Sequence, residues 1–468
     1  MKTKKRKELP PTGGGPELVW PGKRDLFGRL RRAPAGEARL SAVERLPPGA
    51  AGGAARHPNR LIHGENLLAL SALRDELKEK VDLIYIDPPF ATGGDFAHRA
   101  EIGARKLSAE PAREVDAGGY RDDWGKDRTA WFAMMADRLA LARELLAESG
   151  TLYVHVDWNA GHHLRLMLDE IFGADNSLGE IVWAYGSPSG GRTAGKKLVK
   201  AHDFILVFAK SYGRHKFHQV FLPYSERYLA DWFKFKEPDG RRFRKRYRRA
   251  DDGSSFYEKQ YLDESKGVPA STVWTDIQQV YADPRAYKAG MRSEITGYPT
   301  QKPLRLVERV LALSSDEGDR VLDFFCGSGT TLVAAEKMGR RWVGCDSGAS
   351  AVQLAARRLL GLDAVAPFEI QRVHGTPVLA VETPPRAVLE RRGDELRVRL
   401  EGQGKAWDEP IERWSVGSLA QGAFVPRWTA FRTLKDRSLP KESPWTAADA
   451  PIVEVVDVRG ATARLTAS

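Results

Sequence analysis

The sequence contains two cysteines, Cys326 and Cys345, in 468 residues. So few cysteines exclude a disulfide framework and are typical of a reducing compartment, and we interpret both as small packing residues. No stretch of about 18 apolar residues, the length of a membrane-spanning helix, occurs. The first residues, MKTKKRKELPP, lack the apolar core of a secretion signal. We therefore expect a cytoplasmic protein without a membrane segment.

Residues at metal-ligand spacing are also missing. His162 and His163 are adjacent, which is poor geometry for shared coordination, and no cysteine or acid stands at ligand spacing from them. We predict no metal site.

Basic residues are in excess. Lys and Arg number 73 against 62 Asp and Glu, which gives a net charge of +11 and a pI near 9.5. This excess favours a polyanionic partner such as nucleic acid, although charge says nothing about fold. At 468 residues, the chain is long enough for two or three domains.

The segment Val81–Phe90, VDLIYIDPPF, is the one around which the chain is organised. Its apolar part predicts a buried parallel strand, which ends at Pro88 and Pro89 because neither has a backbone N–H. The stiff tip presents the Asp87 carboxylate, the Pro88 carbonyl and the flat ring of Phe90. The two acceptors can hold the two hydrogens of an exocyclic amine on a nucleobase. The ring can stack on a base that is flipped out of its duplex. The alternative is a plain Pro-Pro turn with Asp87 as a helix cap.

A second strand breaks into a glycine turn at Val321–Thr331, VLDFFCGSGTT. Gly327 and Gly329 let a ligand approach the backbone, and the start of the following helix attracts anionic groups. The next predicted strand ends at Asp346, near the distance expected for a ribose-binding acid. Leu332 replaces the third glycine of the dinucleotide motif G-x-G-x-x-G. S-adenosylmethionine is therefore a better candidate than a dinucleotide.

Strands alternate with helices around these two segments, which predicts an α/β fold with a doubly wound, mostly parallel sheet. Glu65 follows a short strand, where it is a ligand candidate or a first-turn acid favoured by the helix dipole. Residues 91–129 lack periodicity, and we expect a structureless functional lid there. The other predicted elements are a helix to about Leu77, helices at 129–147 and 157–172, and strands at 151–156, 181–185 and 204–208.

The stretch Trp232–Arg249 carries nine Lys or Arg with aromatic residues between them. EPDG at 237–240 is a turn signal, so we predict a basic hairpin. A charge run is usually a solvated face, but basic residues with stacking partners suit phosphate contacts better. The candidate nucleic-acid contacts are Arg241, Arg242, Arg244, Lys245 and Arg246.

Composition divides the chain into five parts. We predict a flexible basic segment over 1–58, a first catalytic half over 59–211, a target-recognition insert over 212–298, a cofactor-binding half over 299–362 and a small β-rich domain over 363–468. The last of these follows from short alternating runs with Pro and Gly turns.

Several motifs together resemble the amino-methylating DNA methyltransferases: TQKPLRLVERVLALS over 300–314, VLDFFCGSGTT and GCD, with IDPPF upstream. The order, in which the amine-binding tip precedes the insert and the cofactor loop, resembles their circularly permuted β class. HGENL, IDPPF and YVHVDW resemble modification subunits of type III restriction systems and their solitary relatives. The resemblance covers about residues 59–360.

The resemblance implies roles for particular residues. Asp87, Pro88, Pro89 and Phe90 match the amine-gripping tip. Glu65 stands where Asp is commoner. The cofactor-binding positions that it implies are Glu65, Lys302, Asp323, Phe324, Gly327, Gly329, Thr330 and Asp346.

The resemblance also implies a reaction. The chain would transfer a methyl group from S-adenosylmethionine to the exocyclic amine of a flipped-out adenine in double-stranded DNA, because the DPP form resembles adenine methylators. A cytosine-amine methyltransferase and a DNA-binding subunit with vestigial catalysis stay open as alternatives. A restriction (helicase–nuclease) subunit and a second copy in a homodimer stay open as partners.

Overall fold

The computed structural model describes residues 19–20, 23, 38–48, 58–91, 94, 96–102, 113–120, 122–124, 128–185, 198–280, 294–404, 407–432, 438–447 and 451–466. None of the helices in these ranges has the length and apolar character needed to cross a membrane.

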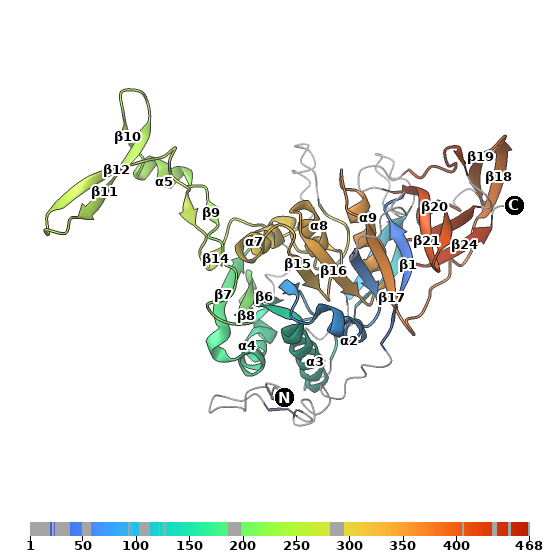
Figure 1. The fold of residues 1–468 in the computed structure, drawn as a ribbon, viewed down its shortest axis with the longest axis horizontal. Helices are drawn as coiled ribbons and strands as arrows, with labels where there is room; N and C mark the ends of the chain where they lie inside the picture. The colour runs from blue at the N-terminus through green and yellow to red at the C-terminus, as the bar shows by residue number, and fades with distance from the viewer. Residues whose placement is uncertain are drawn as a thin grey trace, which may run out of the picture.

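A sheet of 14 strands runs through the molecule (Figure 1). Its core consists of β6, β3, β15, β16, β2 and β17, which are all parallel to one another. The apolar run after Lys80 forms the buried strand β3, as predicted. The strands in spatial order are β14 (Val273–Trp274), β7 (Ser177–Ala184), β8 (His202–Ala209), β6 (Leu146–Val156), β3 (Val81–Ile86), β15 (Arg320–Asp323), β16 (Arg341–Asp346), β2 (Asn59–His63), β17 (Phe368–Val373), β1 (Leu40–Leu46), β21 (Ala423–Phe431), β20 (Ile411–Ala420), β23 (Ile452–Asp457) and β24 (Thr462–Thr466).

Helices cover both faces of the parallel strands. One layer comprises α2 (Asn66–Leu77), α3 (Thr129–Leu145) and α4 (Trp158–Phe172), whose apolar side chains share a core with β3 and β6. The opposite layer comprises α7 (Leu304–Ser314), α8 (Thr330–Lys337) and α9 (Ala349–Leu360). This arrangement confirms the doubly wound α/β prediction, with the chain order of the permuted methyltransferases.

The sheet extends beyond the two catalytic halves that the sequence suggested, and β1 and β17 are the strands next to them. β1 falls in the segment predicted to be flexible, and it pairs antiparallel with β17. β17 falls beyond the predicted boundary at residue 362, and it pairs parallel with β2. The short apolar alternation of β1 is hidden among Gly, Pro and Arg, so composition alone misassigned it.

Regular structure also occurs where the sequence predicted none. β4 (Phe96–Ile102) and β5 (Arg113–Tyr120) form an antiparallel pair within the expected structureless lid. Their sequences, FAHRAEI and REVDAGGY, contain few apolar residues, so no alternating pattern marks them. The prediction of a structureless segment was wrong for these residues.

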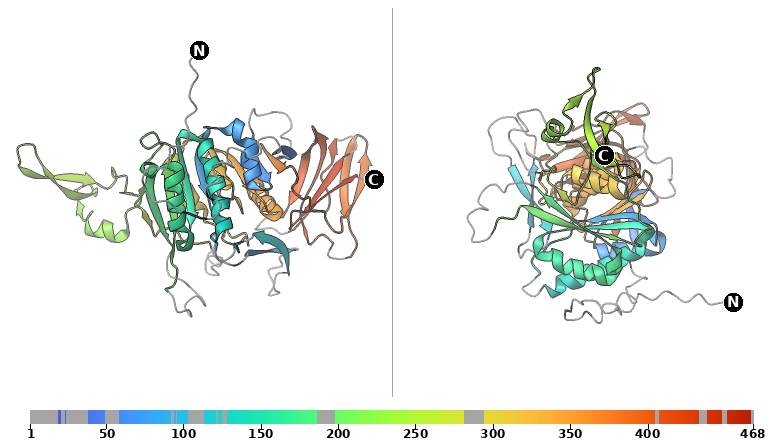
Figure 2. Two further views of the ribbon diagram at one scale, coloured as in Figure 1. Left: turned by 90° about the horizontal axis from the view of Figure 1, so that it is seen from below. Right: turned by 90° about the vertical axis from the view of Figure 1, so that its left-hand side faces the viewer.

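The insert and the C-terminal β strands project from opposite ends of the sheet (Figures 1 and 2). The predicted turn at 237–240 joins β10 (Phe235–Lys236) to β11 (Arg242–Arg249), but β11 pairs mainly with a third strand, β12 (Ser255–Tyr261). The remaining elements are η2 (Ala174–Asn176), β9 (Phe221–Leu222), α5 (Glu226–Asp231), β13 (Val268–Pro269), and β18 (Arg386–Arg392), β19 (Glu395–Glu401) and β22 (Thr446–Ala447), which form a separate sheet.

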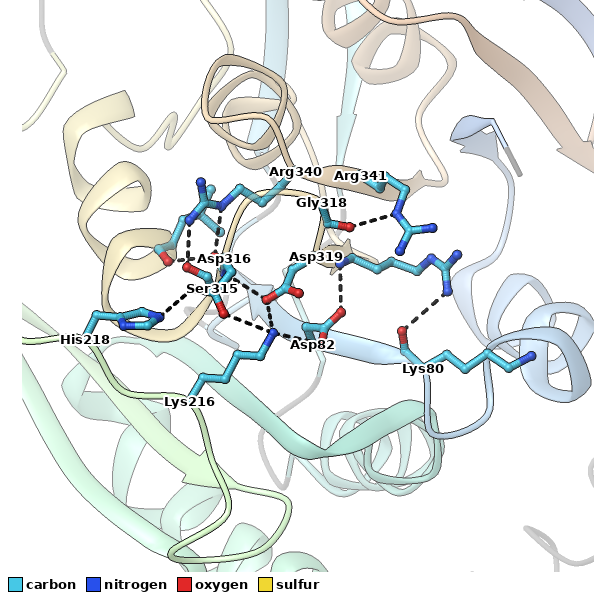
Figure 3. A network of polar contacts seen from close by, with 12 residues as sticks. Lys80, Asp82, Lys216, His218, Ser315, Asp316, Gly318, Asp319, Arg340 and Arg341 are labelled. Carbon is cyan, nitrogen blue, oxygen red and sulfur yellow. Dashed lines mark hydrogen bonds and ion pairs between the residues drawn. The ribbon is translucent and has the colours of Figure 1, made fainter. Parts of the chain in front are cut away.

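A polar network anchors the start of the insert to the amino-terminal edge of the parallel strands (Figure 3). The Lys216 ammonium lies 2.5 Å from Asp319, 3.3 Å from Asp316 and 3.5 Å from Asp82. His218 adds a contact of 2.9 Å to Asp316. The network lies at the amino-terminal ends of β3 and β15, so the opposite edge of the sheet is left for ligands.

Candidate active site

The two predicted loops meet at the carboxyl ends of adjacent strands. β3 and β15 pair in parallel, with Leu83 opposite Val321 and Ile84 opposite Leu322. Ligands of doubly wound sheets bind at this edge. A cavity of about 330 Å³ opens there, and residues from both loops line it. Its lining includes Glu65, Asp87, Pro88, Pro89, Phe90, Lys302, Asp323, Phe324, Gly327, Thr330 and Asp346.

Neighbouring side chains hold the tip Asp87–Phe90 rigid. The indole Nε1 of Trp131 donates a hydrogen bond of 2.8 Å to the Pro89 carbonyl. Just after the tip, the backbone N–H of Ala91 donates to Asp122 at 2.7 Å. Trp131 comes from α3, so the helix layer fixes the direction in which the prolines point. The alternative reading of Asp87 as a helix cap fails, because no helix follows it in the described residues.

The two oxygens of Asp87 have different surroundings. Oδ2 accepts a hydrogen bond from the ammonium of Lys302, which is itself 7% exposed and also donates to the Thr300 carbonyl at 3.3 Å. Oδ1 is buried and has no hydrogen-bond partner among the described residues. A buried acceptor without a partner is costly unless a ligand supplies a donor. Oδ1 is therefore the atom of the tip that is prepared for a donor such as an amine.

The contact of Lys302 differs from the sequence prediction. The resemblance placed this residue among the cofactor contacts, whereas its ammonium lies on the carboxylate of the tip. The cofactor role stays a prediction. The sequence could not reveal the contact between Lys302 and Asp87, because 215 residues separate them.

Asp346 holds the glycine turn in shape. Its Oδ2 accepts from the Gly327 N–H and its Oδ1 from the Gly348 N–H, both at 2.8 Å. Gly329 has φ of +77°, and a Cβ there would lie 2.6 Å from the Cβ of Ala355 on α9. Glycine is required at this position for both reasons. Asp346 therefore has a structural role in the turn. Its contact with the ribose of the cofactor stays a prediction.

Thr330 and Phe324 are fixed around the same turn. The Thr330 hydroxyl donates to the Lys302 carbonyl at 3.2 Å and accepts from Arg358 at 2.9 Å. Phe324 is fully buried, and its carbonyl accepts a 2.7 Å hydrogen bond from Asn66. The cofactor turn and the TQKP segment are thus joined directly.

Glu65 caps a helix as well as lining the cavity. Its side chain accepts from the Leu68 N–H at 2.9 Å at the start of α2, and it pairs with Arg138. Sequence reasoning missed Arg138 and Asn66, which both line the cavity and hydrogen-bond each other. The signal for Arg138 was available, since it is a charged residue on the apolar face of the predicted 129–147 helix.

Acidic side chains dominate the electrostatics of the cavity. Burial, with a smaller contribution from the nearby carboxylates of Asp87 and Asp346, raises the pKa of Asp323 to about 7. A ligand that carries positive charge would relieve this repulsion. The sulfonium and ammonium groups of S-adenosylmethionine fit that requirement. Burial also raises the pKa of the Cys326 thiol, which agrees with a packing role rather than a nucleophilic one.

The predicted nucleic-acid residues lie away from the cavity, on the projecting insert. Arg241 pairs with Asp263 at 2.8 Å and with Glu264 at 2.7 Å. Arg242 donates to two backbone carbonyls at 2.7 and 3.0 Å, and Arg244 donates to Gln260.

The remaining two predicted residues have weaker contacts. Lys245 lies 4.8 Å from the ring centroid of Phe235, and Arg246 stands opposite Glu258 in the β11–β12 register. The role of all five in DNA binding stays a prediction.

Comparison with known proteins agrees with this geometry. Residues 81–357 match a family model described as DNA methylase. The type II methyltransferase M.EcaI of Enterobacter cloacae is 27% identical over 75% of this chain and 79% of its own length. The DNA adenine methyltransferase YhdJ of Escherichia coli is 25% identical over 64% of this chain and 82% of its own.

A longer relative also matches part of the chain. The Mod subunit of the type III restriction-modification enzyme StyLTI of Salmonella typhimurium is 26% identical over 59% of this chain, and the match spans 49% of the subunit. The family model covers more than half of the chain and includes both loops of the cavity. The chain belongs to the DNA methylase family, in which S-adenosylmethionine is the methyl donor.

Proposed function

We propose that this protein methylates the exocyclic amine of adenine in double-stranded DNA, as the modification component of a restriction-modification system or as a solitary methyltransferase. The observation that carries the proposal is the buried Oδ1 of Asp87, which has no hydrogen-bond partner among the described residues and belongs to a residue that lines the same cavity as Gly327 of the glycine turn. An exocyclic amine is the donor that fits this acceptor in a DNA methylase.

The residues of the tip prepare the amine for attack. Asp87 Oδ1 and the Pro88 carbonyl accept its two hydrogens, which favours a pyramidal nitrogen with a localised lone pair. Phe90 stacks on the base, a contact worth about 1–3 kcal/mol. When bound, S-adenosylmethionine supplies an electrophilic methyl group on a positively charged sulfur. Asp87 is placed to take the proton that the nitrogen loses after it gains the methyl group. Positioning and fixed acceptors account for most of the rate gain.

The cofactor would be held by the groups around the glycine turn. Gly327 lines the cavity, so the close approach to its backbone suits the methionine part, whereas the predicted cofactor residue Gly329 packs against α9 instead. Asp323 suits the positive charge of the cofactor, and Glu65 suits its nucleoside. Their carboxylates give the cavity the negative charge that a cationic ligand needs.

Adenine is favoured over cytosine by the Asp-Pro-Pro form of the tip and by the relative YhdJ, whose name describes it as an adenine methyltransferase. A restriction subunit as partner is suggested by the name of the StyLTI Mod subunit, of which this chain matches about half. A homodimer stays a proposal.

The DNA-contacting surface on the insert is better defined by its two faces than by its individual arginines. Side chains alternate between the faces of a strand pair. One face presents Lys245, Tyr247 and Arg249 of β11 with Tyr257 and Lys259 of β12. We call it the lysine–tyrosine face.

Its exposed tyrosines (Tyr247, 62%; Tyr257, 67%) suit bases, and Lys245 and Arg249 suit phosphates, whereas Lys259 is paired with Glu237 at 2.6 Å. On the other face, Arg242, Arg244 and Arg248 are bonded within the insert. The charge of the lysine–tyrosine face is therefore more available to an external polyanion.

The test uses labelled S-adenosylmethionine with mixed-sequence duplex DNA, followed by mass spectrometry of the product nucleosides. We expect label in N6-methyladenine. Label in N4-methylcytosine would support the cytosine alternative, and label in RNA or protein would contradict the proposal.

The substitution Asp87→Ala removes the carboxylate of the tip. We expect it to abolish methyl transfer and to leave DNA affinity, measured by gel shift, unchanged. If wild type and variant bind DNA equally and are equally inactive, the vestigial-subunit alternative is correct.

A further inference from the structure

His155 occupies an unexpected position beneath the tip. Its side chain on β6 is fully buried, in a strand whose neighbouring side chains are mostly apolar. Its ring is nearly parallel to that of Phe90, with 6.2 Å between centroids and 11° between planes. A buried imidazole costs free energy unless its nitrogens find partners. Nothing in the proposed reaction uses this residue, so its presence under the tip needs a reason.

Both ring nitrogens of His155 have partners that fix the plane of the ring. Nδ1 lies 3.0 Å from the hydroxyl of Tyr85 on β3, and Nε2 lies 3.4 Å from Asp203 on β8. The Lys200 ammonium in turn pairs with Asp203. Trp183 closes a third side, with its ring edge-on at 5.5 Å. Three strands therefore determine the orientation of one imidazole.

The charge state of the cluster is consistent with a fixed ring. Burial lowers the pKa of His155, and the positive charge of Lys302 lowers it further, so the imidazole is neutral. Burial alone would raise the pKa of Asp203. The hydrogen bond from His155 and the nearby Lys200 ammonium nevertheless hold that pKa below its ordinary value. An ionised Asp203 accepts from Nε2–H, which leaves Nδ1 to accept from the Tyr85 hydroxyl. One tautomer, and hence one ring orientation, satisfies all three groups.

Phe90 depends on its neighbours for its orientation, because a phenyl ring has no hydrogen-bonding group. His155 lies against one side of it, and the ammonium groups of Lys200 and Lys302 lie 5.6 and 5.4 Å from its centroid. We infer that His155 is a positioning residue for methyl transfer, which holds the Phe90 ring in the plane on which the extruded base stacks. This inference rests on the proposed function.

A double-mutant cycle tests whether His155 acts through Phe90. The variants are His155→Ala, Phe90→Leu and the combination, and the measurements are kcat and the KM for S-adenosylmethionine with mixed-sequence duplex DNA. We expect His155→Ala to lower kcat about tenfold, a typical result of misplacing a reacting group, with KM unchanged. In the Phe90→Leu background the same change should have no further effect. Losses that multiply in the double variant would overturn the inference.

His155→Phe is the control for loss of folding. It keeps a ring under Phe90 but loses the two hydrogen bonds that fix the plane of that ring, so we expect its kcat to lie between those of wild type and His155→Ala. A His155→Phe variant that melts like wild type but is as slow as His155→Ala would contradict a stacking role.

Hydrogen–deuterium exchange of the backbone amides of Asp87, Phe90 and Ala91 provides a readout that needs no methyl transfer. We expect faster exchange in His155→Ala than in wild type or His155→Phe. If the wild type transfers no label, the proposed function fails, but the exchange still tests the contact. Equal exchange in all three proteins would show that His155 does not hold the tip.

Discussion

Asp323 makes the cavity sensitive to pH near neutrality. Its pKa is raised to about 7, first by burial and then by Asp87 and Asp346. Below pH 7 the carboxyl group is protonated and offers no charge to a cationic ligand, whereas above pH 7 it is ionised. We therefore expect the affinity for S-adenosylmethionine to rise about tenfold between pH 6 and pH 8. Calorimetric titration at the two pH values measures this change.

The matched variant is Asp323→Asn, which keeps an oxygen to accept the 3.0 Å hydrogen bond from the Phe325 N–H. Its affinity should be lower and independent of pH. A wild-type affinity as flat as that of the variant would mean that Asp323 is already ionised at pH 6.

Gly329 is the residue of the turn at which substitution should be most harmful. A methyl group there meets Ala355 at 2.6 Å, and the backbone has φ of +77°. Gly318 has a similar φ of +84°, but nothing lies within 4 Å of its Cβ position. Gly318→Ala should therefore cost about 1 kcal/mol of unfolding free energy from backbone strain, and Gly329→Ala about 1–3 kcal/mol more. Urea denaturation of both variants measures the difference, and equal costs would show that α9 moves aside.

The sequence revealed the groups of the site better than their contacts. The tip and the glycine turn were found because strand, turn and chemistry coincide in a few residues. The contacts of Lys302 with Asp87 and of Arg138 with Glu65 were not found, since they join segments 215 and 73 residues apart. Such pairs depend on which strands become neighbours. Periodicity does not contain that information.

At the scale of elements, the insert offers a comparison between its two faces. Lys245→Gln with Arg249→Gln removes two charges from the lysine–tyrosine face. Arg246→Gln with Arg248→Gln removes two charges from the opposite face, where Arg248 pairs with Glu258 at 2.8 Å. We expect the first pair to reduce the slope of log affinity for DNA against log salt by about one per lost phosphate contact, and the second pair to change it less.

Fluorescence anisotropy with a labelled duplex at several salt concentrations measures both slopes. The reverse order would mean that the opposite face, rather than the lysine–tyrosine face, contacts the phosphates. If neither pair changes the slope, the insert does not contact phosphates.

Elements with a strong apolar pattern were predicted well, and elements without one were not. The helices at 129–147 and 157–172 and the strand at 81–86 agree with α3, α4 and β3. The strands β4, β5 and β12 were missed, because their sequences are largely polar and lack a regular apolar alternation. These strands form because they pair with a neighbouring strand. The sequence of one strand alone contains little information about that pairing.

At the scale of the molecule, one continuous sheet joins the catalytic part to the C-terminal strands. β1 carries the connection, since it pairs with β17 on one side and with β21 on the other. Arg413 of β20 reinforces it from within. Its guanidinium makes a bidentate pair with Glu44 of β1, and the arginine and glutamate side chains are 5% and 4% exposed. The N-terminal strand and the C-terminal strands therefore share a buried ion pair.

Removal of Arg413 should weaken this connection. Arg413→Ala leaves the Glu44 carboxylate buried without its cation, which costs about 3–5 kcal/mol. Because the pair joins two parts of the molecule, we expect the C-terminal strands to melt at a lower temperature than the catalytic part, as two transitions in calorimetry. Arg399→Ala is the control, because Arg399 forms half-exposed pairs within the C-terminal domain and should cost less than about 1 kcal/mol. A single transition at the wild-type temperature in Arg413→Ala would show that the backbone pairing of β1 alone holds the two parts together.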